Sequence, residues 1–222
     1  MVKTIRVIGA GRVGSAVSAR LAERGVELRE DGADLVLLCV PDSAIAEVAR
    51  EIQPGPWIAH TSGGTPLGAL DPHVRRFGLH PLQTFTRARG PEQLDGAWAA
   101  VTAEREEATQ VGLELAELLG LRPFELADDE RALYHAGAVV ASNFLVTLHE
   151  AAAELVEAAG APAEALEPLM RGVIENGFEL TGPIARGDWD TVAAHRAAIQ
   201  EHRAELDHLY ETLAGATLAL AT

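Results

Sequence analysis

The sequence predicts an α/β fold, with a doubly wound sheet in the first part of the chain and only helices in the second. Short apolar runs alternate with helix-like segments up to about residue 126, as they do when helices connect the parallel strands of a sheet. Residues 35–40 are apolar without a break, which is typical of a strand buried on both faces. From residue 127 onward only helical patterns follow. We therefore expect two domains, residues 1–126 and 127–222.

The individual elements follow from apolar runs bounded by glycine, proline and polar residues. In the first domain, strands are expected at residues 5–8, 35–40, 57–60, 77–80, 97–102 and 123–126, and helices at 15–21, 44–52 and 104–119. In the second domain, helices are expected at residues 128–159, 163–180, 189–202 and 204–220. Asp188 is expected to cap the helix at 189–202, because its carboxylate can accept a hydrogen bond from a free N–H group of the first turn.

A glycine motif joins the first strand to the first helix. Gly9, Gly11 and Gly14 form a G-x-G-x-x-G sequence directly after the apolar run. The first glycine permits a tight turn, the second lets a pyrophosphate approach the backbone, and the third lets helix and strand pack closely. The free N–H groups of the helix N-terminus attract the anion. The motif predicts a Rossmann-like NAD(P)-binding domain, with Arg12 and Val13 beside the cofactor.

The adenosine side of this domain is expected to be reduced. Only six residues separate a possible short strand at 26–28 from the strand that begins at Leu35, whereas a parallel crossover takes a dozen or more. The second βαβ unit is therefore shortened, vestigial or missing. Glu30 is a candidate acceptor for a ribose 2′-hydroxyl and Arg29 a candidate partner for a 2′-phosphate; the alternative is a charged, solvated turn. NADP is the expected cofactor, with NAD possible.

The composition argues against several classes of function. The net charge is −15, so electrostatics oppose binding to nucleic acid and to anionic membranes. No apolar run is expected to reach the length of a membrane span, and the first strand leaves no room for a signal peptide, so a cytoplasmic protein is expected. The single lysine, Lys3, precedes the first strand, which argues against lysine chemistry. Cys39 is the single cysteine, and no Cys/His spacing of a metal site occurs, so no metal is expected.

Polar residues follow the expected strands at their carboxyl ends, where open α/β sheets bind ligands. The candidates at this edge are, for the cofactor, Val40, Pro41 and Asp42; for proton transfer, His60 and His80; and for a substrate carbonyl or carboxylate, Ser62 and Gln83. Histidine suits proton transfer because its unperturbed pKa is about 6.5. For each histidine the alternative is a structural role, bonded to the backbone at a strand end.

The long helix expected at 128–159 has two different faces. Larger apolar residues recur at helical spacing on one side, and the other side mixes small apolar residues with polar ones. Such a mixed face suits a second covered surface, so we expect a homodimer formed through the helical domain. His135 and Asn143 are the candidates in this helix to reach a substrate. In the loop at 180–188, Arg186 is a candidate clamp for a carboxylate or phosphate, against the alternative of a structural interhelix loop.

These residues together resemble a family of bacterial proteins, catalogued as domain of unknown function 2520, in which a Rossmann-like domain precedes a half similar to the C-terminal domain of 6-phosphogluconate dehydrogenase. The most specific matches are residues 78–85, 134–136, 141–144 and 181–188. The wider superfamily is similar to pyrroline-5-carboxylate reductases, ketopantoate reductases and 3-hydroxyacid dehydrogenases. This resemblance implies a substrate between the sheet edge and the helical domain, and dimers that share the long helix. The 3-hydroxyacid dehydrogenases use a lysine one turn before an asparagine; here that position is Val139, so their mechanism is not inherited.

Two functions are consistent with the sequence. The first is an NAD(P)-dependent oxidoreductase acting on a small oxo, imino or hydroxy acid, with His80 or His60 as acid or base and Asn143 positioning the substrate. The second is a non-enzymatic dimer that senses a nucleotide or metabolite. The absence of a catalytic lysine and the shortened adenosine side favour the sensor, whereas the clustering of His60, His80 and Gln83 favours the enzyme.

Overall fold

The computed structural model describes residues 2–221, and their contacts divide the chain into two compact units, Met1–Val140 and Ala141–Thr222. Each unit is described by itself. The predicted boundary at residue 126 marks where strands give way to helices, whereas the contact boundary falls inside the long helix α4 (Arg131–Ala158). The first turns of α4 belong to unit 1 because their side chains pack there. The boundary between domains at 126 stays a prediction.

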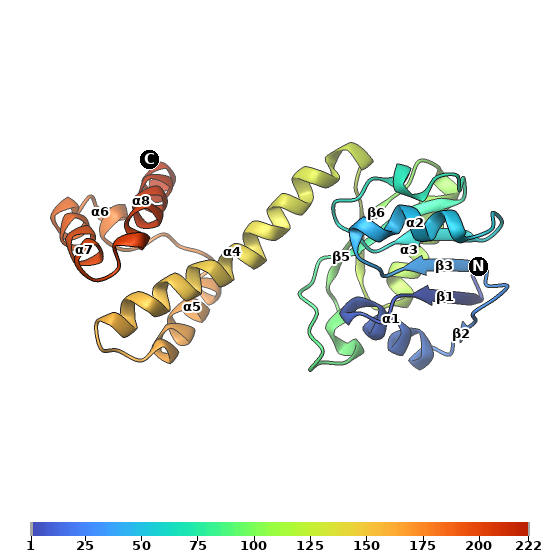
Figure 1. Cartoon of the computed structure of the whole chain (residues 1–222), viewed down its shortest axis with the longest axis horizontal. Helices are drawn as coiled ribbons and strands as arrows, with labels where there is room; N and C mark the ends of the chain where they lie inside the picture. Colours follow the sequence, from blue (N-terminus) through green and yellow to red (C-terminus); the bar gives the residue numbers. More distant parts are fainter. Residues whose placement is uncertain (1, 222) are drawn as a thin grey trace. The chain divides into compact units, whose positions relative to one another are not determined.

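Unit 1 is built on a seven-stranded sheet in the order β2-β1-β3-β4-β5-β6-β7 (Figure 1). Its strands are β1 (Thr4–Ile8), β2 (Glu27–Leu28), β3 (Leu35–Leu38), β4 (Trp57–His60), β5 (Arg76–Pro81), β6 (Trp98–Thr102) and β7 (Arg122–Glu125). The six strands expected from the sequence are all present, with bounds shifted by at most two residues at either end. The predicted α/β fold class is confirmed.

One pairing departs from a purely parallel sheet. Strands β5 and β6 pair antiparallel, and all the other neighbours pair parallel. The chain between them contains only a short 3-10 turn, η3 (Pro91–Leu94). An antiparallel neighbour needs no crossover helix, so this connection returns to the sheet at the edge from which it left.

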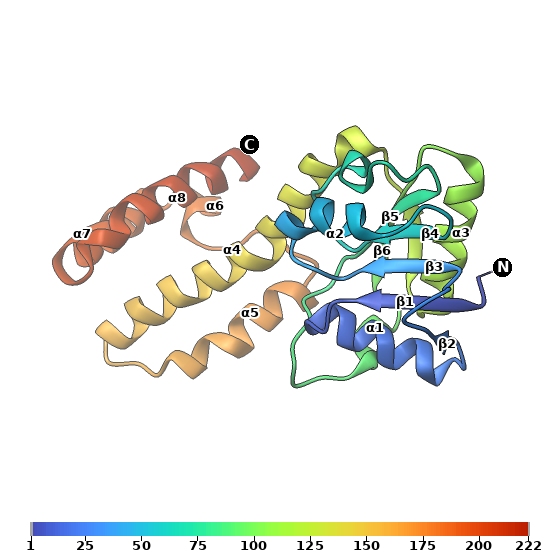
Figure 2. The same cartoon turned by 45° about the vertical axis from the view of Figure 1, so that its right-hand side comes forward.

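Helices cover both faces of the sheet, as the sequence predicts. Leu35 and Leu37 of β3 contribute to the core under α1 (Arg12–Glu23) and α3 (Glu106–Leu118), whereas the alternate residues of the same strand contribute to a second core with α2 (Ile45–Glu51). This alternation follows from the two-residue period of a strand. Figure 2 shows α1 and α2 on opposite sides of β1 and β3.

The expected shortening beside β1 is confirmed. Strand β2 has two residues and is followed, without a helix, by β3. Residues 29–34 form a turn in which the backbone N–H groups of Lys3 and Thr4 donate to the Asp34 carboxylate at 2.9 and 3.0 Å. These two bonds lower the pKa of Asp34 and attach the turn to β1.

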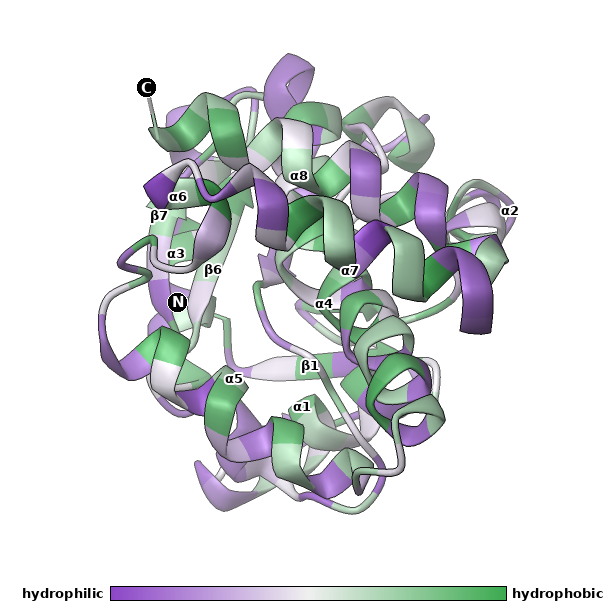
Figure 3. Ribbon diagram, turned by 90° about the vertical axis from the view of Figure 1, so that its left-hand side faces the viewer, coloured by the Kyte–Doolittle hydropathy of each residue, from purple (hydrophilic) through white to green (hydrophobic). Residues whose placement is uncertain are grey.

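Unit 2 contains only helical elements among its described residues. After the second half of α4 come η5 (Ala163–Ala165), α5 (Leu166–Glu175), α6 (Pro183–Arg186), α7 (Trp189–His202), η6 (Ala204–Leu206) and α8 (Asp207–Ala221). Hydrophobic residues, green in Figure 3, recur along α5 and α8. Asp188 caps α7 as predicted, accepting a hydrogen bond from the Thr191 N–H at 3.2 Å.

Helix α5 ends earlier than the predicted residue 180. It stops at Glu175, because Gly177 and Phe178 have positive φ angles of 70° and 63°. A left-handed glycine commonly ends a helix, whereas a left-handed phenylalanine is rare. The sequence contains the glycine signal at 177, but the apolar residues beyond it concealed the end of the helix.

The expectation that no apolar segment reaches the length of a membrane span was wrong. Among residues 2–221, the helix Asp128–Ala158 is long and apolar enough to cross a membrane by length and composition alone. No Asp, Glu, Lys or Arg occurs from 132 to 149. The polar residues His135, Ser142 and Asn143 interrupt this stretch. It therefore contains no continuous apolar run of that length, although its mean hydropathy is high.

Candidate functional site

The glycine loop between β1 and α1 has the geometry that each glycine of the motif requires. Gly9 has a φ of 112°, and a Cβ there would lie 2.3 Å from the Cys39 carbonyl oxygen. A Cβ at Gly14 would lie 1.9 Å from the Gly9 oxygen. At Gly11, in contrast, a Cβ would meet nothing within 4 Å. Gly9 and Gly14 are therefore needed for the fold itself, whereas Gly11 leaves space for a ligand.

Helix α1 begins at the open side of this loop. Its N-cap residue is Gly11, and no side chain caps it. The first N–H groups of an uncapped helix carry a partial positive charge and have no partner within the helix. The loop and the helix start therefore form a position at which a pyrophosphate fits.

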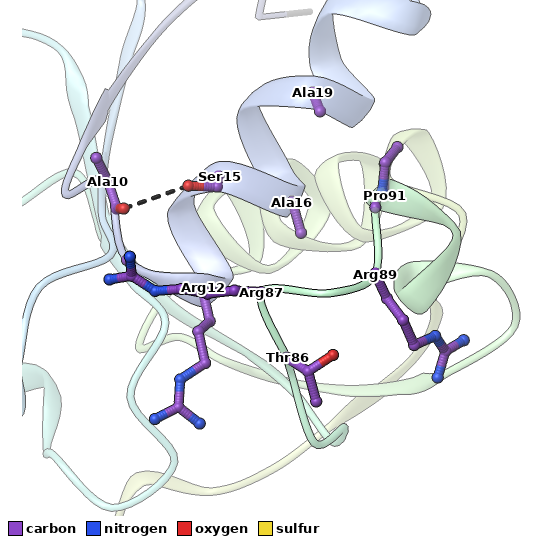
Figure 4. Close-up of a pocket in the computed structure, with 11 residues that line it drawn as sticks. Ala10, Arg12, Ser15, Ala16, Ala19, Thr86, Arg87, Arg89 and Pro91 are labelled. Atoms are coloured by element: carbon purple, nitrogen blue, oxygen red, sulfur yellow. Dashed lines mark hydrogen bonds between the residues drawn. The ribbon is translucent and has the colours of Figure 1, made fainter.

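A pocket of about 270 Å³ extends from the glycine loop along α1 (Figure 4). Its second wall is the segment after β5, from Thr86 to Pro91. Three arginines line it, Arg12 from α1 and Arg87 and Arg89 from that segment. Arg12 donates to the Phe85 carbonyl oxygen at 3.5 Å. Three guanidinium groups in a chain of net charge −15 make this pocket suited to an anionic ligand.

Arg87 and Arg89 were not among the residues predicted from the sequence. Their segment follows the expected fourth strand, but nothing in the local sequence indicates that it reaches across to α1. The connection does so because Arg20 of α1 is buried and anchors it, donating to the Pro91 carbonyl oxygen at 2.9 Å and to the Asp95 carboxylate at 2.6 Å. The signal in the sequence was an arginine, Arg20, among the small and apolar residues of the helix expected at 15–21.

The remaining predicted cofactor residues divide into two groups. Val40, Pro41 and Asp42 follow β3 at the edge where the glycine loop follows β1, since Ile8 pairs with Leu38. Arg29 instead forms a two-point ion pair with Glu27, at 2.7 and 3.1 Å.

Glu30 lies on the same exposed turn. Its carboxylate is 3.6 Å from the Arg6 Nε. Arg29 and Glu30 thus both have ionic partners, on β2 and β1 respectively, which fits the alternative of a charged, solvated segment.

The two strand-end histidines differ in their surroundings. His60 is 0 % exposed, and neither ring nitrogen has a hydrogen-bond partner among the described residues. Desolvation, reinforced by the Arg131 charge, lowers the pKa of His60 to about 3. His80 is partly buried, and its Nδ1 lies 2.8 Å from the Tyr134 hydroxyl. Desolvation and then His135 and Arg131 lower the pKa of His80 to about 4.

Both histidines are therefore neutral at neutral pH, which corrects the expectation that they titrate near 6.5. The geometry favours His80 over His60 as a group that meets a ligand. Its partner Tyr134 stands at the start of α4, and desolvation raises the pKa of this phenol to about 12. The His135 ring, from the same turn, packs edge-on against His80 with centroids 5.8 Å apart.

A buried arginine, Arg131, lies close to these histidines. Arg131, the first residue of α4, is 1 % exposed. Its Nε donates to the Thr65 carbonyl oxygen and its Nη1 to the Thr102 hydroxyl, each at 2.8 Å, and its Nη2 donates to the Ser62 carbonyl oxygen. This residue was not among those predicted from the sequence. Gly78 was the signal, because a glycine inside a strand often marks a close approach by another group.

Three predicted substrate or catalytic residues have structural partners in their own segment. The Ser62 hydroxyl is 2.8 Å from the Thr65 hydroxyl and accepts a hydrogen bond from the Thr65 N–H. The Gln83 amide donates to the Gln93 carbonyl oxygen and accepts from the Thr84 N–H. Asn143 accepts from the neighbouring Ser142 hydroxyl at 3.0 Å.

The structure of unit 1 brings together His60, His80, His135 and Ser62 around Arg131. Asn143 and Arg186 belong to unit 2, and their roles toward a substrate stay predictions. No group of three or more metal-binding side chains occurs among the residues that the structure describes.

Comparison with known proteins places the chain in a family. The model for "Domain of unknown function (DUF2520)" matches residues 97–217, which is more than half of the 222 residues. The chain belongs to the DUF2520 family. No curated protein matches it.

Solved structures share this fold over the whole chain. Protein BF3122 from Bacteroides fragilis, named as a candidate NADP oxidoreductase, is 23 % identical with a TM-score of 0.81, over 98 % of each chain. Protein TM1727 from Thermotoga maritima is 22 % identical with a TM-score of 0.78, over 98 % of this chain and 97 % of that one. A reductive aminase from Aspergillus terreus, in complex with NADPH and ethyl levulinate, is 14 % identical with a TM-score of 0.70, over 99 % of this chain and 94 % of that one. At these identities the likeness shows the fold.

Gly78→Ala tests the packing around Arg131. A Cβ at Gly78 would lie 2.7 Å from the Arg131 Nη1 and 3.3 Å from the His60 Cε1. We expect this substitution to lower the free energy of unfolding by about 1–3 kcal/mol, the usual cost of overpacking. Chemical denaturation measures it. Gly68→Ala is the control, because a Cβ there would meet nothing within 4 Å. Equal stability of the two variants would contradict this packing around Arg131.

Acid should destabilise this unit through its buried histidines. The folded-state pKa values of His60 and His80, about 3 and about 4, lie below the unfolded value of about 6.5. Below about pH 6.5 the unfolded state therefore binds more protons, and stability falls as the pH decreases. We expect the free energy of unfolding of His60→Leu to change less between pH 7.5 and 5 than that of the unsubstituted protein. An equal change would show that His60 does not contribute.

Proposed function

We propose that this chain is an NAD(P)-dependent oxidoreductase, with NADP as its cofactor and a small oxo, imino or hydroxy acid as its substrate. The observation that carries this proposal is the glycine loop. A Cβ has no room at Gly9 or Gly14, whereas Gly11 faces open space at the uncapped start of α1. The arginine-lined pocket beside the loop favours the more anionic NADP over NAD. The relatives named as an NADP oxidoreductase and as an NADPH-bound aminase support the general class.

His80 is the proposed proton-transfer group. A bound nicotinamide supplies or accepts a hydride, and the protein supplies orientation and protons. In the tautomer whose Nδ1–H donates to the Tyr134 oxygen, the His80 Nε2 is free to accept the proton of a substrate hydroxyl. The lowered pKa of His80 keeps the ring neutral, which is the state that a base requires. His60 is fully enclosed and suits a structural role instead.

Titration of the full chain with NADPH and NADH under native mass spectrometry tests the cofactor proposal. We expect binding of both dinucleotides, with NADPH the tighter. A screen of small oxo and imino acids, followed at the nicotinamide absorbance, then tests the reaction. Failure to bind either dinucleotide would contradict the proposal.

A sensor is the second candidate, favoured by the reduced adenosine side and by Arg29, which is paired with Glu27. In that case a bound dinucleotide raises the melting temperature but no substrate in the screen is turned over.

We further propose that the protein is a homodimer formed through unit 2. Large apolar side chains of α4 and α5 are exposed, among them Phe144 at 53 % and Leu169 at 66 %. Exposed apolar surface of this kind marks an interface. Light scattering at micromolar concentration is expected to give a dimer, and Phe144→Glu with Leu169→Glu a monomer. Val74→Glu, at a residue of unit 1 that is 65 % exposed, is the control. A monomeric unsubstituted protein would refute this arrangement.

A further inference from the structure

The strongest unexplained feature of unit 1 is the buried charge of Arg131. Its three hydrogen bonds within the described residues go to neutral oxygens, those of Ser62, Thr65 and Thr102. No carboxylate lies within ion-pair distance of its guanidinium among the residues that the structure describes. A buried cation is normally paired with an anion. Asp128 and Asp42 attract the Arg131 charge from beyond ion-pair distance, so this charge still favours an anionic ligand close to it.

Arg131 also fixes the direction of a backbone amide. The Ser62 carbonyl oxygen accepts from the Arg131 Nη2. In a planar trans peptide the N–H points opposite to the C=O, so the Gly63 N–H points away from Arg131. The N–H groups of Gly63 and Gly64 donate to no acceptor within residues 2–221, and Gly63 is buried. Buried backbone N–H groups without a partner are rare, and successive free N–H groups bind anions.

The histidines exclude a side chain at Gly63 and leave little room for one at Gly64. A Cβ at Gly63 would lie 2.6 Å from the His135 Cδ2 and 2.9 Å from the His80 Nε2, and one at Gly64 would lie 3.1 Å from the His135 Nδ1. The backbone of Gly63 and Gly64 therefore lies against the rings of His80 and His135, next to the proposed proton-transfer nitrogen, His80 Nε2. At Gly63, only glycine permits the rings to approach the backbone so closely.

We infer that the Gly63 and Gly64 N–H groups bind the carboxylate of the substrate, and that Arg131 is a positioning residue that directs them. A carboxylate matches the buried positive charge of Arg131 and offers two acceptor oxygens to two donors. Arg131 acts through the Ser62 peptide and does not touch the ligand. This subsite rests on the proposed oxidoreductase function, since it places an acid substrate beside His80.

Nuclear magnetic resonance of the full chain labelled with ¹⁵N-glycine tests the subsite, because the chain has 21 glycines and each amide reports separately. The probes are pyruvate and its uncharged counterpart pyruvamide, added to the protein with and without NADP⁺. We expect pyruvate to shift the Gly63 and Gly64 amide signals to saturation, and pyruvamide to bind at least about tenfold more weakly. Chloride at the same ionic strength should have no saturable effect.

Arg131→Met should weaken pyruvate binding by at least about tenfold. Arg76→Met is the matched control, because Arg76 is also a largely buried arginine. It lies at the end of β5 away from His80 and is paired with Asp71 and Glu104. Should Arg131→Met fail to fold, the glycine signals of the unsubstituted protein still decide the matter.

Two outcomes would overturn the inference: pyruvate shifts that miss Gly63 and Gly64, or equal binding of pyruvate and pyruvamide. The Gly9 and Gly11 amides report NADP⁺ separately. If NADP⁺ shifts them and pyruvate fails at Gly63 and Gly64, only the subsite is wrong. If NADP⁺ itself fails to bind, the proposed function is wrong, and pyruvate shifts at Gly63 and Gly64 without NADP⁺ would still support the anion subsite.

Discussion

Gly11→Val is expected to weaken NADPH binding by about 100-fold or more while leaving the protein folded. The φ of Gly11 is −72°, which valine adopts readily, and no protein atom lies within 4 Å of its Cβ position. The new side chain fills the space that a pyrophosphate needs. Hydrogen bonds to a charged group contribute about 1.5–3 kcal/mol each, and each 1.4 kcal/mol is a tenfold change in affinity. Isothermal titration with NADPH measures the loss.

Gly14→Ala is the informative comparison for this variant. Its Cβ would lie 1.9 Å from the Gly9 oxygen, so it should lower the melting temperature, whereas Gly11→Val should not. An unchanged NADPH affinity in folded Gly11→Val would rule out the glycine loop as the phosphate site.

His80→Asn is expected to lower turnover by about 10²–10⁴-fold, the usual contribution of a positioned acid or base, while sparing NADPH affinity. Since the pKa of His80 is about 4, its ring is neutral above that pH, and activity should fall as the pH decreases through about 4. That acid limb should vanish in His80→Asn. Steady-state kinetics from pH 3.5 to 8 in the oxidative direction, with NADP⁺ and the hydroxy acid that corresponds to a substrate found in the screen, measures both effects, because only in that direction does His80 act as a base.

Two further variants make this assignment specific. His149→Asn is the control, because the His149 side chain is 40 % exposed and pairs with the neighbouring Glu150. Tyr134→Phe removes the partner of the His80 Nδ1 and should cost roughly tenfold, as expected for a neutral hydrogen bond. Turnover that survives His80→Asn would show that another group moves the proton.

The order of strands and helices was predictable from the sequence because it depends on local patterns. A few neighbouring residues suffice to predict the buried strand β3, the glycine turn and the Asp188 cap. The same holds for the alternation of strands and helices that covers both faces of the sheet. The antiparallel return of β6 was not predictable in this way, because strand direction depends on how residues 82–97 pack against α1.

The sequence by itself determined the fold class, the glycine loop and the position of His80 at a sheet edge, since these follow from residue type and spacing. Only the tertiary structure decided which groups share one environment. It enclosed His60 without a partner, set Tyr134 against His80 and brought the arginines of residues 87 and 89 to α1. It also placed the Arg131 guanidinium against Gly78, where it donates a hydrogen bond to the Ser62 carbonyl oxygen. The reason is that burial and hydrogen bonding are set by contacts between distant residues, on which local sequence patterns carry no information.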